Sequence, residues 1–435
     1  FSRVIDCLSR SYEFADASIS NIIRTKNNCP VYIMNKLLQL IGASALAQLV
    51  SILISPVLSR LYSPDDFGTY GNIIIIVYFI NAFSLLRLEI NLLKSSSDKE
   101  EIYSYAVSYL LLISVGTSLI VWFFKFDLNY FLLPFLLLIS GYYNLLHHDL
   151  LGKNKIKDIL NNKFLLAFLI AIFQIVAGLI SNTAFSLLVG QLIGMALTLL
   201  FMPIIFCDLK FKGVLRKYKK QLLYDAPSNA INVLSNHLPF LLFFQLFGAI
   251  SAGYYYMAFR ILILPINVIS TSTHSFIAAS HEHEDNLSVQ KRLLRIFIIF
   301  PLPFIIIVHF YINNLVDIFL GNNWYITGNI IRYCLGWIYI RFIFDSFLIN
   351  YSLKDNQEVN LIFQVFSIIL QASSIIICFI LNLDFIEAIK TFCFISSITY
   401  VIGLYFLLKK SNILDYKLFS LLIFSLSILT YILLD

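Results

Sequence analysis

Long apolar runs separated by short polar segments dominate the sequence. Each run holds about 18 or more mostly apolar residues, enough for a helix to cross a hydrocarbon core of about 30 Å. The runs predict twelve membrane spans, at 37–59, 71–93, 103–124, 129–151, 164–181, 184–206, 226–248, 252–280, 293–313, 325–350, 359–381 and 386–408. The chain is therefore predicted to be an all-α integral membrane protein.

A thirteenth apolar run follows at 417–434. It has about 17 uninterrupted apolar residues, which is close to the lower limit for a crossing. Three alternatives stay open for this run: it crosses the membrane, it lies in the interface, or it is one member of an unfinished pair of helices.

Composition and charge agree with a membrane protein. The chain is 59% hydrophobic and 13% charged, with a mean hydropathy of +0.82, values typical of membrane proteins and not of soluble domains. Under the predicted topology, the outer loops hold only Arg60, Lys125 and Lys390, and the inner loops hold most other basic residues. This asymmetry places the start of the first span in the cytoplasm. The net charge of +6 therefore reflects topology, and nucleic acid is not an expected partner.

The first hairpins of the two sets of six spans resemble each other weakly. Pro56 is followed by a Gly-x-Tyr sequence, and Pro239 is followed by another at a similar distance. The similarity suggests a duplication of six spans in parallel orientation. It predicts two six-helix lobes, 37–221 and 222–410, with 411–435 as an additional hydrophobic segment.

Residues 1–36 form a polar N-terminal extension. The chain starts at Phe1, and Met34 stands directly before the first span. We interpret the extension as absent from the native protein, which would then begin near Met34; a genuine cytoplasmic tail is the alternative. The extension has mixed charges and no apolar core, so it does not have the layout of a signal peptide.

The stretch 223–280 combines two apolar spans with unusual polar residues. Arg260 stands about eight residues inside a span, where a charge costs roughly 2.5–3.5 kcal/mol, so it is expected to face protein or a water-filled cavity. His237 and His274 lie in the same stretch and can change charge. A cation at this depth suggests a pathway for an anionic cargo.

Two other span ends carry polar groups. Arg87 and Glu89 lie near the inner end of the second span, and two helical residues that are two positions apart point in nearly opposite directions. We therefore expect them to reach the interface separately, not to form a local ion pair. Asp149 follows two histidines at the inner end of the fourth span, where we expect the start of a hydrated loop; a proton-handling group is the alternative.

The tenth span is the other charged helix. Arg341 and Asp345 are four residues apart and can meet on one helix face, whereas Arg332 is nine residues before Arg341 and points the other way. The pair is either a structural ion pair or a titratable group in a transport path.

Three phrases resemble one known family. They are ISPVLSRLYSPDDFGTYG, LLRLEINLLKSSSDKE and SNHLPFLLFFQLFGAISAGYYYMAFRILILPINVIS. They are similar to the O-antigen and capsule flippases, the Wzx-type polysaccharide transporters of the multidrug/oligosaccharidyl-lipid/polysaccharide exporter superfamily. The resemblance covers about residues 36–410.

The resemblance implies two six-helix bundles around a central cavity. It implies that the cargo is an undecaprenyl-diphosphate-linked oligosaccharide, an O-antigen or capsule repeat unit. This cargo would cross from the cytoplasmic to the periplasmic leaflet of the bacterial inner membrane by alternating access. H⁺ or Na⁺ is the coupling ion that we expect, and no cofactor is expected. The expected partners are the lipid-linked glycan, the bilayer, a polysaccharide polymerase and a chain-length regulator.

Site residues follow from the resemblance and from charge. The resemblance implies that Arg260 faces the cavity. It also implies that the Arg-x-Glu sequence of Arg87 and Glu89 matches a family pattern. The planar guanidinium of arginine can form two parallel hydrogen bonds to phosphate oxygens. The predicted contacts to the diphosphate or sugar are Arg87, Arg260, Arg332 and Arg341. The candidates for coupling or gating are Glu89, Asp149, His237, His274 and Asp345.

Two other functions compete with a flippase. A drug or small-metabolite antiporter of the same superfamily would have the same sequence features. A membrane polysaccharide polymerase would need a sizeable outer loop with catalytic groups, and no predicted outer loop exceeds about a dozen residues. The sequence has no phosphate-binding Gly-rich loop, nucleophile elbow or metal motif, so we expect a transporter and not an enzyme.

Overall fold

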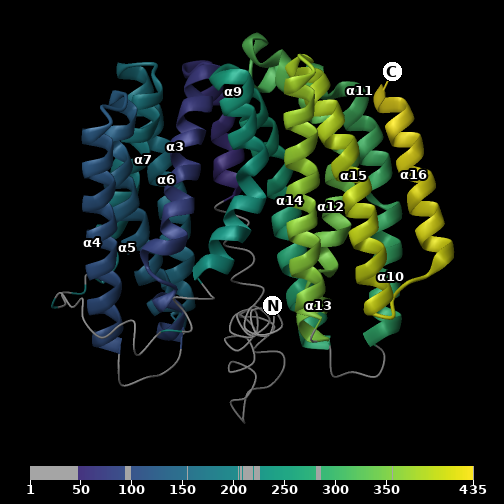
Figure 1. Cartoon of the computed structure of the whole chain (residues 1–435), viewed down its shortest axis with the longest axis horizontal. Helices are drawn as coiled ribbons and strands as arrows, with labels where there is room; N and C mark the ends of the chain where they lie inside the picture. Colours follow the sequence, from purple (N-terminus) through teal and green to yellow (C-terminus); the bar gives the residue numbers. More distant parts are fainter. Residues whose placement is uncertain are drawn as a thin grey trace. The chain divides into compact units, whose positions relative to one another are not determined.

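The computed structural model describes residues 48–93, 99–153, 155–203, 205, 208, 219, 226–280, 286–354 and 356–434. Among these residues the regular structure is helical and no strand occurs (Figure 1). The helices form two compact units that divide between His237 and Leu238. The predicted all-α fold in two bundles is confirmed, and the extension 1–36 lies outside the described residues.

The first unit begins, within the described residues, with the helix Gln48–Leu61. The helices that follow are α3 (Pro64–Ser84), η1 (Leu88–Leu93), α4 (Lys99–Phe123), η2 (Leu128–Leu132), α5 (Leu133–Gly152), α6 (Ile156–Ile180) and α7 (Ala184–Leu200). The two η elements are short 3₁₀ helices.

Helix α3 has a well-defined start and an unexpected end. A reciprocal capping box joins Ser63 and Asp66, and Pro64 occupies the first helical turn, so the chain begins the helix here. The predicted span 71–93 is wrong at its inner end, because α3 stops at Ser84. Leu86 and Arg87 then adopt left-handed backbone angles, with φ of 52° and 58°, which turn the chain out of the helix.

Helices α6 and α7 pack closely and share buried polar groups with the start of the unit. A Cβ on Gly190 would lie 2.6 Å from the backbone of Gln174, so only glycine allows this approach. The Gln174 side chain donates to the Tyr70 hydroxyl (3.3 Å), which donates to Gln191 (2.8 Å). These buried amides hold the helices of the first unit together.

The second unit contains α9 from Leu238 onward; α9 as a whole runs over Ala226–Ser280. The remaining elements are α10 (Asn286–Ile299), α11 (Pro301–Phe319), η4 (Asn322–Trp324), α12 (Tyr325–Phe347), α13 (Ile349–Leu353), α14 (Gln357–Ile380), α15 (Phe385–Lys410) and α16 (Tyr416–Leu434).

Helix α9 is divided at Gly248. This residue has φ of 87° and ψ of 170°, a non-helical conformation that favours glycine. The break confirms the turn predicted between the spans 226–248 and 252–280. Pro239 and Pro265 lie inside the two parts of α9.

Helix α12 forms the core of the second unit. Most of its residues are buried, and it packs against α11, α15 and α16. Trp337 is 2% exposed and its ring lies 5.0 Å from that of Phe392 on α15, in an edge-on arrangement. Such aromatic contacts add to the packing of the helix on its neighbours.

Several described helices meet the requirements for membrane crossing. Eight stretches of the described residues are long and apolar enough, and three shorter apolar helices accompany them. Helix α12, which contains charged residues, is not among these eight. Most of its residues are buried by neighbouring helices. The thirteenth run forms α16, which packs against α10, α12 and α15. The protein is therefore a multi-pass membrane protein.

Candidate functional site

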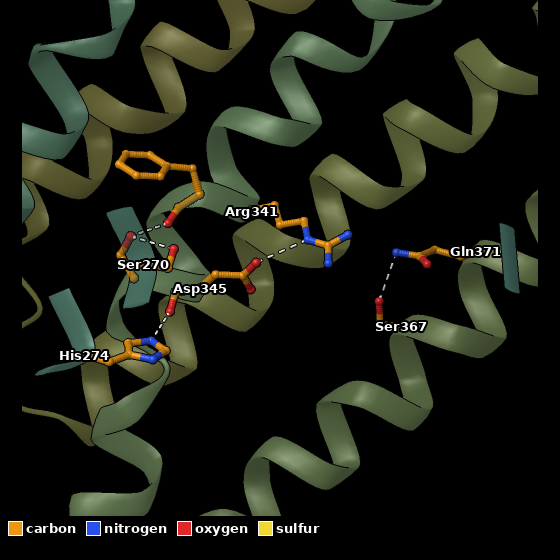
Figure 2. A network of polar contacts seen from close by, with 8 residues as sticks. Ser270, His274, Arg341, Asp345, Ser367 and Gln371 are labelled. Carbon is orange, nitrogen blue, oxygen red and sulfur yellow. Dashed lines mark hydrogen bonds and ion pairs between the residues drawn. The ribbon is translucent and has the colours of Figure 1, made fainter. Parts of the chain in front are cut away.

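The charged face of α12 forms a polar network inside the second unit (Figure 2). Arg341 Nε donates to Asp345 Oδ2 at 3.2 Å, across one turn of the helix. This contact confirms the ion pair predicted from the spacing of the two residues. The pair keeps a cation and a carboxylate together in the interior of the bundle.

Aromatic rings surround the guanidinium of Arg341. Its central carbon lies 5.6 Å from the ring centre of Phe259, 5.7 Å from that of Trp337 and 6.0 Å from that of Tyr400. Arg341 is only 9% exposed. Cation–π attraction is strongest where the cation is desolvated, so the rings and Asp345 together compensate for burial of the charge.

Helix α9 is linked to the same turn of α12. His274 Nε2 lies 2.5 Å from the main-chain oxygen of Asp345, and because a carbonyl only accepts, Nε2 carries the proton. One turn earlier, the hydroxyls of Ser270 and Ser346 are 3.3 Å apart. These two contacts join α9 to the turn of α12 that carries Asp345.

Helix α14 faces the network across from Arg341. Figure 2 shows Ser367 and Gln371 on the side toward which the guanidinium points. Gln371 Nε2 donates to the Ser367 hydroxyl at 3.2 Å, so the two side chains are bonded to each other within α14.

Arg332 lies on α12 but has a different environment. Its Nε is buried and has no hydrogen-bond partner. Among the described residues no carboxylate forms an ion pair with Arg332, whereas both Arg87 and Arg341 have one. Arg332 is thus a half-buried arginine on α12 that has no ion pair with a carboxylate of the described residues.

The structure corrects the expectation for Arg87 and Glu89. They form an ion pair, with Arg87 Nη1 3.6 Å from Glu89 Oε1, and Glu89 is 5% exposed. The prediction of opposite directions assumed a continuous helix. Because the left-handed residues Leu86 and Arg87 end that helix, the two side chains meet.

The expectation of a hydrated loop at Asp149 is wrong. Helix α5 continues to Gly152, and Asp149 is fully buried within it. Lys153, one turn later, places its Nζ 2.5 Å from Asp149 Oδ2. The pair explains how the carboxylate is tolerated at this position.

The remaining predicted residues lie on α9. Arg260 is half-buried and lies one helical turn after Tyr256. His237 is also half-buried, and its ring centre is 6.1 Å from that of Tyr78. Of the predicted set, the structure brings His274, Arg341 and Asp345 into one network and pairs Arg87 with Glu89.

Sequence reasoning missed the residues that complete this network. Ser270, Phe259, Trp337 and Tyr400 come from three helices, and nothing in the spacing of these residues indicated a common neighbour. The described residues contain no group of three or more His, Cys, Asp or Glu side chains arranged to hold a metal ion.

Solved structures show which fold this is. The chain is similar to the lipid II flippase MurJ in an inward closed conformation (TM-score 0.68, 16% identity, 92% of each chain covered). It is also similar to an outward-facing multidrug resistance MATE family transporter of the MOP superfamily (TM-score 0.58, 14% identity, 89% of this chain and 97% of the other). A third is a MOP superfamily transporter from Pyrococcus furiosus (TM-score 0.57, 13% identity, 87% and 95% covered). At these identities the likeness concerns the fold, which is that of transporters.

Sequence comparison establishes the family. No curated protein matches the chain. The family model described as polysaccharide biosynthesis protein matches residues 57–327, more than half of the chain. With this match and the transporter fold, the chain belongs to the polysaccharide biosynthesis protein family.

Proposed function

We propose that the protein is a flippase for an undecaprenyl-diphosphate-linked oligosaccharide, an O-antigen or capsule repeat unit. It would move this cargo from the cytoplasmic to the periplasmic leaflet of the bacterial inner membrane by alternating access. The family match supports a role in polysaccharide biosynthesis. The fold supports transport, since one solved protein of similar fold is a lipid II flippase.

One structural observation carries the proposal. Arg332 lies in a helix of the membrane domain and has no carboxylate partner among the described residues. A diphosphate needs compensating cations when it crosses a low-dielectric layer, and guanidinium matches phosphate oxygens with two parallel hydrogen bonds. An uncompensated membrane arginine is expensive, so a visiting anion gives it a function.

The ion pair of α12 is the proposed coupling element. Binding of H⁺ or Na⁺ at Asp345 would weaken its attraction to Arg341 and free the guanidinium to rearrange. Each ion that moves down a gradient adds about 2.3 kcal/mol per 100 mV of membrane potential. His274 is bonded to the backbone of the same residue and would transmit the change to α9.

A drug or small-metabolite antiporter is the second proposal. The MATE-type structures of similar fold favour it. The polysaccharide family match favours the flippase, because it concerns the sequence of this chain over residues 57–327.

Deletion of the gene in its host separates the two proposals. A flippase mutant accumulates undecaprenyl-diphosphate-linked glycan and loses surface polysaccharide, whereas an antiporter mutant changes its drug susceptibility with normal surface polysaccharide. Complementation with Arg332→Ala is expected to fail at wild-type protein levels, and Arg332→Lys is expected to restore part of the export. Full export by the alanine variant would contradict the assigned role.

Genomic neighbours offer a further check on the proposed partners. Genes for glycosyltransferases, a polysaccharide polymerase and a chain-length regulator beside this gene would support a lipid-linked glycan as cargo.

A further inference from the structure

Helix α11 carries two polar residues, His309 and Asn313, near its contact with α12; we call these two, together with Asn329 and Arg332, the polar strip. His309 is only 8% exposed and lies on the same face as the buried Ile305, Ile312 and Val316. Other faces of α11 expose large apolar side chains, among them Phe310 at 64%. The imidazole therefore points into the α11–α12 packing and away from lipid.

Asn313, one turn after His309, crosses to α12. Its Nδ2 donates to Asn329 Oδ1 at 3.1 Å. Gly328 makes room for this contact, because a Cβ there would lie 2.5 Å from Asn313 Oδ1. Replacing this glycine would thus fill the space that the amide now occupies.

The strip leaves buried polar atoms without partners. His309 Nδ1, Asn313 Oδ1 and Arg332 Nε are all buried and make no hydrogen bond. Arg332 is three residues after Asn329 on α12, so it lies about one helical turn from the Asn313–Asn329 contact. A buried polar atom without a hydrogen bond is unfavourable, most of all in a charged group, so a ligand that bonds these atoms would gain binding free energy.

The unsatisfied atoms define the chemistry of that ligand. Among these atoms, Arg332 Nε can donate to a phosphate oxygen, and so can His309 Nδ1 in the tautomer that carries a proton there. The orphaned acceptor Asn313 Oδ1 suits a hydroxyl beside the phosphate, as in a sugar or a glycerol head group. Among the described residues, no carboxylate forms an ion pair with Arg332 and would compete for it.

The Lys and Arg content of the neighbouring loop indicates where the polar strip lies along the membrane normal. The connection 320–324 between α11 and α12 has no lysine or arginine, in agreement with its outer position in the topology predicted from the Lys/Arg asymmetry of all loops. Arg332 is seven residues into α12, about 10 Å from that end at 1.5 Å per residue. The strip therefore lies within reach of the outer leaflet.

We propose that His309, Asn313, Asn329 and Arg332 form a binding site for the phosphate ester of a membrane lipid, on the outer part of the α11–α12 pair. The site would receive the cargo's phosphate on the outer side or hold an outer-leaflet phospholipid. The choice of a lipid-linked diphosphate as ligand rests on the proposed function. The inference that the site binds a phosphate ester is independent of it and comes from the side chains alone.

Binding to the purified full chain tests the site. Farnesyl diphosphate, farnesol and phosphatidylglycerol are titrated in detergent, with native mass spectrometry to count bound molecules. We expect Arg332→Gln to weaken farnesyl diphosphate binding about 10- to 100-fold, as loss of a charge-assisted hydrogen bond does, with little change for farnesol. His309→Leu and Asn313→Leu should weaken it less.

Matched controls separate a site effect from general charge. Arg292→Gln removes an exposed arginine on α10 and should leave binding unchanged. Arg332→Lys should bind between wild type and Arg332→Gln, which guards against a folding defect. Equal binding by wild type and Arg332→Gln, or an equal loss in Arg292→Gln, overturns the site.

The two lipid ligands make failure of the site distinguishable from failure of the proposed function. Arg332-dependent binding of farnesyl diphosphate supports both. Arg332-dependent binding of phosphatidylglycerol alone supports the phosphate site and counts against the diphosphate-linked cargo. If the Arg332→Gln variant loses export in cells but binds both lipids as the wild type does, the site has no role in export.

Discussion

Each of the two units contains an arginine–carboxylate pair, and the two pairs form in different ways. In the first unit, Arg87 and Glu89 are two residues apart and meet at 3.6 Å because left-handed residues end α3. In the second unit, Arg341 and Asp345 meet at 3.2 Å within an uninterrupted helix, among aromatic rings.

The difference lies in what each pair requires from its surroundings. The pair of the first unit depends on a backbone conformation that costs about 1–3 kcal/mol for a residue other than glycine, and the Arg87 side chain is 27% exposed to solvent. The pair of the second unit has relaxed helical geometry but deeper burial. We infer that the first pair is an interfacial feature and that the second is an element on which the bundle depends.

The largest effect is expected from Asp345→Leu. It removes the carboxylate beside a buried guanidinium, which costs about 3–5 kcal/mol of folding stability in comparable pairs. Thermal unfolding in detergent measures the loss. The double variant Arg341→Met/Asp345→Leu should recover most of the stability and still lack export; equal stability of the single and double variants would contradict the assigned pairing.

Arg260→Ala is expected to abolish surface polysaccharide without loss of membrane insertion, and Arg260→Lys should keep part of it. Arg260 lies on α9, and its substitution tests whether a membrane arginine outside the two pairs binds the cargo. Surface polysaccharide is measured at matched protein levels. Normal export by the alanine variant would remove Arg260 from the site.

A smaller effect is expected from Glu89→Gln. The substitution removes the charge but keeps a hydrogen-bonding side chain, and solvent near Arg87 screens the pair, so stability should fall by about 1 kcal/mol or less. The same unfolding assay applies. A loss as large as that of Asp345→Leu would erase the distinction between the two units.

The smallest effect is expected from Lys390→Ala. Its ion pair with Glu387, at 3.0 Å, lies at the start of α15, where the Glu387 side chain is 52% exposed. Exposed pairs of this kind contribute about 0–1 kcal/mol. Stability and export should both match the wild type, and a clear loss of export would point to a role for the outer end of α15.

Much of the fold could be predicted from the sequence because its causes are local. Apolar runs of sufficient length form spans, and Gly248 adopts the break that the residues around it indicated. The Arg341–Asp345 pair followed from a spacing of four residues, which a helix converts into proximity without help from other elements.

The inner end of α3 could not be predicted in the same way. Leu85, Leu86 and Arg87 carry no glycine or proline signal, and the left-handed turn exists only because the rest of the first unit supports it. Leu85 and Leu88 are buried in the core of that unit with side chains of α4 and α5, so tertiary packing overrides the local helical preference. The ion pair of Arg87 and Glu89 is a consequence of that packing.

The sequence by itself determined the class of protein and the contact between Arg341 and Asp345, one helical turn apart, because hydrophobic length and helical periodicity are properties of a single segment. Only the tertiary structure decided which side chains from separate helices meet, such as Tyr400 beside Arg341 and Asn313 beside Asn329. Those meetings depend on the rotation and spacing of packed helices, which no single segment encodes.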